Sequence, residues 1–306
     1  MKMLDFIKKT LYVIVVLTAV PLIVLSCGNN KKSADHSGTI NAFASILPEA
    51  YFVQRIGGEY VKASVLVQPG QSPETFEPTP QQMAELSDAD VLFGIGVPFE
   101  DALFVKIKSS MPGVTIVHAD QGIAKIPMES SHVHEAASEP AGAPDPHIWL
   151  DPKRAIQISE NIRDALIKKE PDHKEDFDAN FFKLKNDLET TDSLIAEKLK
   201  PYRGRNFYVM HPAFGYFAEA YGLHQKAIEV EGKEPSAREL AGLIKEMISE
   251  HVKTIFVEKQ FSTDMADRLA SELGTRVVAI DPLAYQYIDN LESISDAISD
   301  ALGGQP

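Results

Sequence analysis

Residues 171–200 have the sequence PDHKEDFDANFFKLKNDLETTDSLIAEKLK, a long charged stretch within a chain of 306 residues. Its apolar residues recur near the 3.6-residue period of an α-helix: Phe177, Phe181, Leu184, Leu188, Leu194 and Leu199. A helix of about 28 residues would be about 42 Å long, at 1.5 Å per residue. The alternative is a plain surface helix, but this length predicts one rigid helix that links two lobes.

Alternating strand and helix patterns lie on both sides of this helix. Short apolar runs predict strands at 40–46, 61–67, 91–95 and 114–118 before it, and at 206–210, 225–228, 254–257 and 276–280 after it. Buried strands separated by helices are typical of parallel sheets that are covered on both faces. The predicted fold class is therefore α/β, with two lobes of mainly parallel sheets and a cleft between them.

The N-terminal segment is typical of an export signal. Lysines precede an apolar run at 11–25, which ends at Val24-Leu25-Ser26-Cys27, a stretch that resembles a bacterial lipoprotein cleavage box. We expect Cys27 to be lipidated, although an uncleaved signal anchor is an alternative. The expected divisions are a signal peptide at 1–26, a flexible tether at 27–38, an N-terminal α/β lobe at 39–170, the linking helix at 171–200 and a C-terminal α/β lobe at 201–306.

Composition excludes some classes of partner. A formal net charge of -14 argues against nucleic acid, since phosphate binding needs clustered Lys and Arg. Cys27 is the only cysteine, so the chain forms no intramolecular disulfide. With 44% hydrophobic residues, the chain is long enough to bury one large core or two smaller ones.

Metal-competent side chains follow several of the predicted strands. Ligands of doubly wound folds bind beyond the carboxyl ends of the strands, and four segments there carry Glu74, His147, His211 and Asp281. Each residue taken alone is more typical of a structural role than of a metal ligand. Together, two imidazoles and two carboxylates would form a four-ligand site for a borderline divalent cation in the cleft between the lobes.

Other polar residues have less certain roles. Glu77, Asp151, Glu231 and Glu258 could hydrogen-bond the ligands or be exposed acids. Residues 121–146 lack periodicity and are rich in small residues and proline, so we expect a mobile loop. Its His132 and His134 could form a weak secondary metal site or have no metal role.

Six ordered segments resemble the zinc and manganese solute-binding proteins of ATP-driven importers, the cluster A-I type. They are SPETFEPTPQQMAELSDADVLFGIG, DPHIWLDP, HPAFGYFAEAYGL, EGKEPSARELAGLI, TIFVEKQFS and DPL, and the resemblance runs from about residue 39 to the C-terminus. It implies that His147, His211 and Asp281 are ligands. Glu74 stands where the family has a histidine. His211 stands where manganese-type members have Glu, which favours Zn²⁺ as the transported ligand over Mn²⁺ or Fe²⁺.

The resemblance also implies a role and partners. We expect an exported, monomeric lipoprotein, anchored to a membrane through Cys27 on the extracytoplasmic side, which delivers the metal to the permease of an ABC importer. The sequence has no His-Glu-x-x-His, Gly-x-Ser-x-Gly or Walker motif, so we expect no enzyme activity. The alternatives from other classes are a secreted zinc hydrolase and a surface adhesin.

Overall fold

Two parallel β-sheets form the framework of the chain. The computed structural model describes residues 38–128, 143–229 and 234–304, and within them each sheet has four strands. The first sheet has the order β2-β1-β3-β4 and contains β1 (Ile40–Ala44), β2 (Val61–Val65), β3 (Val91–Gly94) and β4 (Thr115–His118). The second has the order β6-β5-β7-β8 and contains β5 (Asn206–Val209), β6 (His224–Ala227), β7 (Thr254–Glu258) and β8 (Arg276–Ile280). All strand pairs are parallel, which confirms the predicted fold class.

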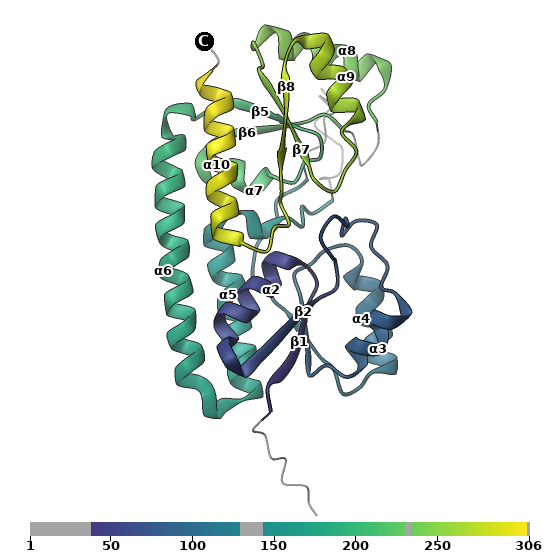
Figure 1. Ribbon diagram of the computed structural model, residues 1–306, viewed down its shortest axis with the longest axis vertical. Helices are drawn as coiled ribbons and strands as arrows, with labels where there is room; N and C mark the ends of the chain where they lie inside the picture. The colour runs from purple at the N-terminus through teal and green to yellow at the C-terminus, as the bar shows by residue number, and fades with distance from the viewer. Residues whose placement is uncertain (1–37, 129–142, 230–233, 305–306) are drawn as a thin grey trace, which may run out of the picture. The chain divides into compact units, whose positions relative to one another are not determined.

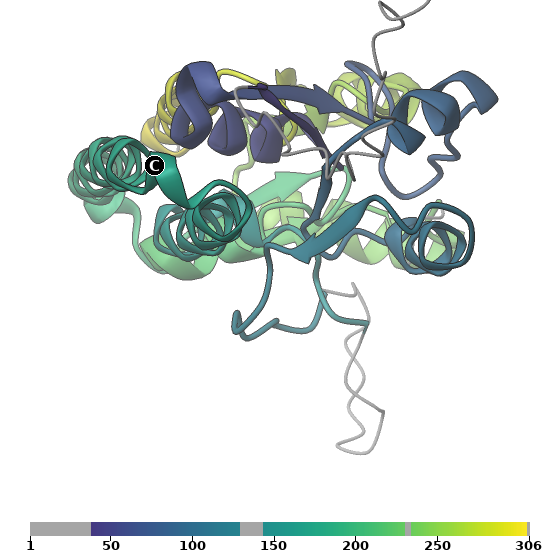
Figure 2. The same ribbon diagram turned by 90° about the horizontal axis from the view of Figure 1, so that it is seen from below.

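Helices cover these sheets and join them. Their bounds are α2 (Leu47–Gly57), α3 (Pro80–Ser87), α4 (Glu100–Ser110), α5 (Pro152–Lys169), α6 (Lys174–Leu199), α7 (Gly215–Tyr221), α8 (Ala237–Ser249), α9 (Asp264–Leu273) and α10 (Tyr287–Gly303). Seen from below, α5 and α6 lie on one side of the first sheet and the blue α3 and α4 on the other (Figure 2). None of the described helices combines the length and the apolarity that a membrane span requires.

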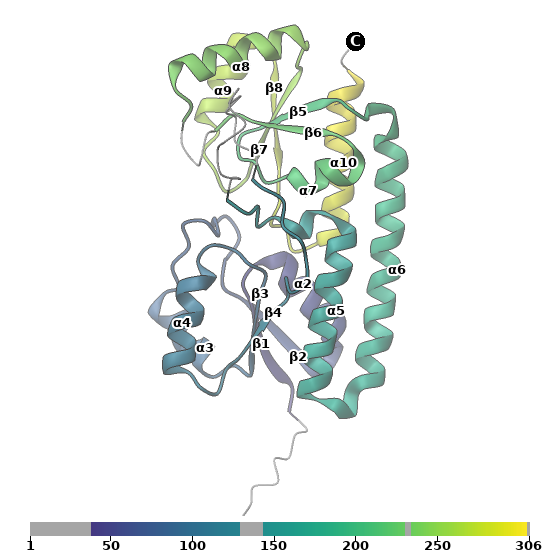
Figure 3. The same cartoon turned by 180° about the vertical axis from the view of Figure 1, so that it is seen from behind.

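The predicted linking helix is present as α6. It has 26 residues, about 39 Å at 1.5 Å per residue, and runs alongside both sheets (Figures 1 and 3). One predicted position is wrong: Leu194 is 55% exposed, and Ile195 is buried in its place. Ile195 lies seven residues after Leu188, two helical turns along the buried face, whereas Leu194 is rotated by about 100° from it.

The N-termini of two helices confirm local sequence signals. The Asp151 side chain accepts a hydrogen bond from the backbone N–H of Lys153 and so caps α5, with Pro152 at the first helical position. Ser236 and Glu239 form a reciprocal capping box at the start of α8. These short-range patterns fix where the helices begin, and with them the loops that precede the helices.

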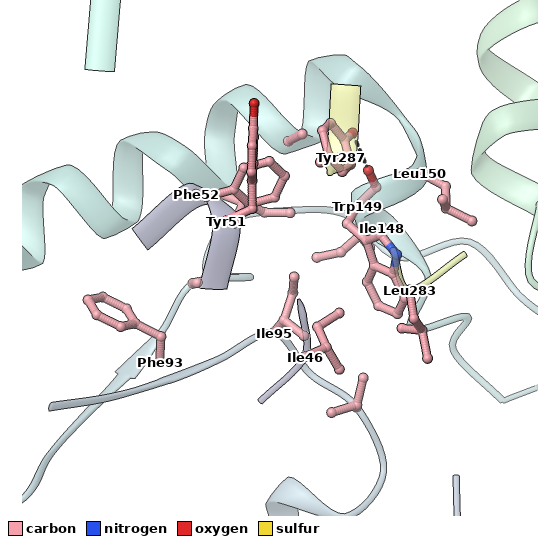
Figure 4. Packing of buried hydrophobic residues seen from close by; sticks show 14 of the residues in the cluster. Ile46, Tyr51, Phe52, Phe93, Ile95, Ile148, Trp149, Leu150, Leu283 and Tyr287 are labelled. Atoms are coloured by element: carbon pink, nitrogen blue, oxygen red, sulfur yellow. Dashed lines mark hydrogen bonds between the residues drawn. The ribbon is translucent and has the colours of Figure 1, made fainter. Parts of the chain in front are cut away.

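A continuous apolar core connects the two sheets. It contains Phe93 of β3, Leu184 of α6 and Phe207 of β5. Trp149 makes hydrogen bonds to two residues near the C-terminus. Its indole N–H donates to the backbone oxygen of Pro282 at 2.7 Å, and its backbone oxygen accepts from the Tyr287 hydroxyl at 2.5 Å. Figure 4 shows the Trp149 ring beside Leu283. The turn before α5 is thereby fixed to the turn after β8.

Residues 39–306 form one compact unit, and the lobe boundaries that we predict within it stay predictions. Several expectations lie outside the described residues. These are the signal peptide at 1–26, nearly all of the tether at 27–38, the lipidated Cys27, Glu231, and the loop residues His132 and His134.

Candidate metal centre

Three of the four predicted ligands converge on one place. Glu74, His147 and His211 each offer a ligand atom, and these atoms all lie within 4.8 Å of one another. Glu74 comes from the loop between β2 and α3, His147 from the turn before α5, and His211 from the segment that directly follows β5. The carboxyl edges of both sheets therefore contribute to one centre, as parallel topology predicts.

The pocket around these side chains is small. It is also lined by Gln260, Phe261 and Leu283, and its volume is about 10 Å³, the room of a single water-sized sphere. An organic ligand does not fit in such a space. A single ion does.

His211 is held by carboxylates on both ring nitrogens. Its Nε2 lies 2.9 Å from Glu74 Oε1, and its Nδ1 lies 2.5 Å from Glu229 Oε1. Its ring also stacks on Phe261, with 5.0 Å between the ring centroids. Burial by itself lowers the pKa of His211, but the hydrogen bonds to Glu229 and Glu74 outweigh burial and raise that pKa to about 10. The ring is then an imidazolium that joins two carboxylates, and a divalent cation can take the place of its proton at Nε2.

The contact with His211 changes the pKa of Glu74 in the opposite direction. Burial raises the pKa of its carboxyl, but the hydrogen bond to His211 and the nearby imidazole charge outweigh burial and lower it. Its backbone N–H donates to Ser72 Oγ at 3.2 Å, and the adjacent Pro73 is buried. The loop therefore presents an ionised carboxylate to the centre.

His147 is oriented by Asp145. Asp145 Oδ1 accepts from the His147 backbone N–H at 2.9 Å and lies 2.7 Å from His147 Nδ1. Asp145 is itself 1% exposed, and its backbone oxygen accepts from the Tyr216 hydroxyl at 2.8 Å. Because Nδ1 is engaged, Nε2 is the ring nitrogen that is left for a metal. Carboxylate–histidine pairs of this kind are typical of metal ligands.

Sequence reasoning missed the roles of Glu229 and Asp145. Glu229 lies two residues after β6, which is at the same carboxyl edge as His211. His211 was predicted because it follows the carboxyl end of a strand, and Glu229 satisfies the same rule. It is therefore the acid that could have been predicted to reach the second ring nitrogen of His211. Asp145 lies two residues before His147, a spacing that allows a side chain to accept from the backbone ahead of it.

Asp281 lies outside the group of three. Its Oδ1 accepts from Gln260 Nε2 and from the Leu283 backbone N–H, both at 2.9 Å, and its Oδ2 lies 3.7 Å from Lys259 Nζ. Its carboxylate is thus engaged by protein groups beside the centre. Asp281 as the fourth ligand stays a prediction.

The remaining acids differ in their positions. Glu258 is fully buried, and its Oε2 accepts from the His211 backbone N–H at 3.3 Å, so it holds the backbone of a predicted ligand. Burial raises the pKa of Glu258 to about 8. Asp151 instead caps α5 and pairs with Arg154 at 2.6 Å, and Glu77 is exposed.

Comparisons with known proteins agree with a zinc centre. Residues 43–301 match the family model described as zinc-uptake complex component A, periplasmic. The high-affinity zinc uptake system protein ZnuA of Bacillus subtilis is 32% identical, over 94% of this chain and 96% of the relative. The zinc-binding lipoprotein AdcA of Streptococcus pneumoniae is 30% identical, over 86% of this chain and 53% of the relative.

Solved structures show the same architecture. A crystal structure of ZnuA is 36% identical with a TM-score of 0.80, and covers 86% of this chain and 99% of that one. A ZnuA deletion mutant with zinc bound is 35% identical with a TM-score of 0.81, and covers 88% and 100%. With a family model that matches most of its length and a relative that aligns over nearly all of both chains, this chain belongs to the ZnuA family, the periplasmic zinc-binding components of zinc-uptake complexes.

Proposed function

We propose that the chain captures Zn²⁺ with a Glu74 carboxylate oxygen and the Nε2 atoms of His147 and His211. The observation that carries this proposal is the convergence of the three ligand atoms within 4.8 Å, with both imidazoles held by carboxylates. Ligands about 2.0–2.1 Å from a tetrahedral ion lie about 3.4 Å from one another. The three side chains need to move only slightly to enclose the ion.

The donor set favours zinc over harder cations. Two imidazole nitrogens and one carboxylate suit a borderline cation in tetrahedral geometry, whereas Mn²⁺ favours more oxygen ligands in octahedral geometry. The fourth coordination position belongs either to Asp281, as predicted from the family resemblance, or to a water molecule. We therefore expect Zn²⁺ to displace Mn²⁺ at neutral pH.

The chain then delivers the metal to the permease of an ABC importer and is not itself an enzyme. It acts as a monomer, anchored on the extracytoplasmic side through a lipid on Cys27. Removal of the thiol by Cys27→Ser should leave the protein exported but free of the membrane, since acyl chains make the anchoring stable. Fractionation of cells that express the variant tests the anchor separately from metal binding. The histidines of the 121–146 loop, His132 and His134, are proposed to assist loading only.

The binding proposal is tested with protein purified without added metal. Metal analysis gives the stoichiometry, and competition with a chromophoric chelator gives the affinity for Zn²⁺. His147→Ala and His211→Ala should each weaken binding by at least about a hundredfold, on the order of 2.7 kcal/mol. His224→Ala is the matched control, because His224 is exposed at the start of β6. Equal affinities of the two site variants and the control would exclude this centre.

A further inference from the structure

Gln260 lies between the three-ligand group and Asp281. It follows β7 by two residues and lines the pocket that contains Glu74, His147 and His211. It also lines the adjacent pocket that contains Asp281.

The polarity of the contact with Asp281 fixes the orientation of the amide. An ionised carboxylate only accepts hydrogen bonds, so Gln260 must turn its Nε2 toward Asp281 Oδ1, which lies 2.9 Å away. The amide oxygen then points elsewhere. This Oε1 is buried and has no hydrogen-bond partner among the described residues. The side chain is therefore held in place by its bond to Asp281 and gains no compensating bond at its other end.

Asp281 is restrained from three directions. Besides Gln260, the Leu283 backbone N–H donates to the same Oδ1 at 2.9 Å, and Lys259 Nζ lies 3.7 Å from Oδ2. Lys259 is largely exposed, so water screens its charge. The Leu283 N–H belongs to a turn that Trp149 fixes through Pro282. Gln260 is the restraint that a side-chain rotation can release.

We propose that Gln260 is a positioning residue that holds Asp281 away from the metal and so controls how tightly and how long Zn²⁺ is held. This inference rests on the proposed ligand set. When the cation is bound by the other three ligands, its charge attracts the Asp281 carboxylate, and the bond from Gln260 to Oδ1 opposes the movement of that carboxylate toward the cation. When Gln260 recaptures Asp281, the fourth position opens and the cation leaves more readily. The residue therefore favours release to an acceptor at the expense of affinity.

The test is a double-mutant cycle of Gln260→Leu and Asp281→Asn in the full-length protein, with Zn²⁺ as the probe. Leucine keeps much of the side-chain volume but cannot bind Asp281. Gln260→Leu should tighten Zn²⁺ binding about fivefold, which corresponds to the free energy of one ordinary hydrogen bond. The gain should come from slower dissociation of Zn²⁺, measured by its transfer to an excess of chelator. In the Asp281→Asn background the same substitution should change neither quantity. Gln71→Leu is the matched control, since Gln71 lines the Asp281 pocket but its side chain accepts from the Gln68 backbone N–H.

Each outcome has a definite meaning. Unchanged or weaker binding by Gln260→Leu overturns the inference, and so does a tightening that persists in the Asp281→Asn background. Glu74→Ala, measured in the same assay, reports on the ligand set itself. If Glu74→Ala binds Zn²⁺ like the wild type, the ligand set fails, whatever Gln260→Leu does. Thermal unfolding of each metal-free variant verifies that it is folded.

Discussion

Zinc binding at pH 8 should release close to one proton from His211. In the metal-free protein the His211 ring lies between Glu229 Oε1 at 2.5 Å and Glu74 Oε1 at 2.9 Å, which raises its pKa to about 10. At pH 8 a histidine with the ordinary pKa of about 6.5 is only about 3% protonated. A group with a pKa of about 10 is about 99% protonated. His211, as a proposed ligand, would therefore have to lose a proton that an ordinary imidazole would not carry.

This proton competes directly with the cation. Between about pH 7 and pH 9, the apparent affinity for Zn²⁺ should rise about tenfold for each unit of pH. At pH 7 the difference of about three units from the pKa weakens the apparent affinity about a thousandfold, or about 4 kcal/mol.

The same shift has a consequence for stability without metal. Because the folded pKa exceeds the unfolded value of about 6.5, the contribution is complete below about pH 6.5 and is lost as the pH rises through about 10.

Calorimetric titration in two buffers that differ in ionisation enthalpy counts the protons. Glu229→Gln is the informative variant, since it keeps an oxygen near Nδ1 but removes one of the charges that hold the proton. It should release fewer protons than the wild type at pH 8, while a zinc-bound water would contribute to both. Glu77→Gln, a change of an exposed acid in the Glu74 loop, should match the wild type. The reasoning is refuted if the wild type releases fewer than about 0.3 protons at pH 8, or if Glu229→Gln releases as many as the wild type.

Three further expectations concern single elements of the chain. In chelator competition, Glu74→Ala should weaken Zn²⁺ binding about 10- to 100-fold or more, and Glu74→His should restore it. The control Glu77→Ala should have no effect. If Glu74→Ala binds Zn²⁺ within about threefold of the wild type, Glu74 is not a ligand. Deletion of residues 129–139 should leave the tight site nearly intact, and a loss of about a hundredfold would show that the loop supplies a ligand. Glu49→Gln should flatten the fall in melting temperature of the metal-free protein between pH 5 and pH 7. Burial and the charge of the neighbouring Glu100 raise the pKa of Glu49, and burial raises the pKa of Glu100 to about 7. Stability that is present at low pH is therefore lost as the Glu49 carboxyl loses its proton; an unchanged slope would contradict this.

Much of the site could be predicted because its residues are marked by local signals. His147 and His211 follow turns and strands that the apolar pattern locates, and a parallel sheet brings the carboxyl ends of its strands to one edge. Glu74 also lies in a loop after a predicted strand, but it was proposed as a ligand because it occupies the place where the resembled family has a histidine. The caps at Asp151 and Ser236 depend on residues three positions apart or fewer, which a sequence states directly.

The partners of these residues depend on distances that no local pattern contains. Glu229 reaches His211 only because β6 pairs with β5 in the observed register, and a shift of that register would turn the acid to the other face of the sheet. Asp281 was predicted from its place after β8, but the packing of Gln260 and Leu283 decides which group its carboxylate binds.

The sequence by itself therefore determined the α/β class, the long helix, the zinc-type family and three side chains that converge on one centre. Only the tertiary structure decided which acid holds each imidazole, and that Asp281 lies outside the group of three. The reason is physical. Periodicity and capping are short-range properties of a chain, whereas hydrogen bonds between loops arise from strand register, helix packing and side-chain rotamers that are fixed together when the core closes.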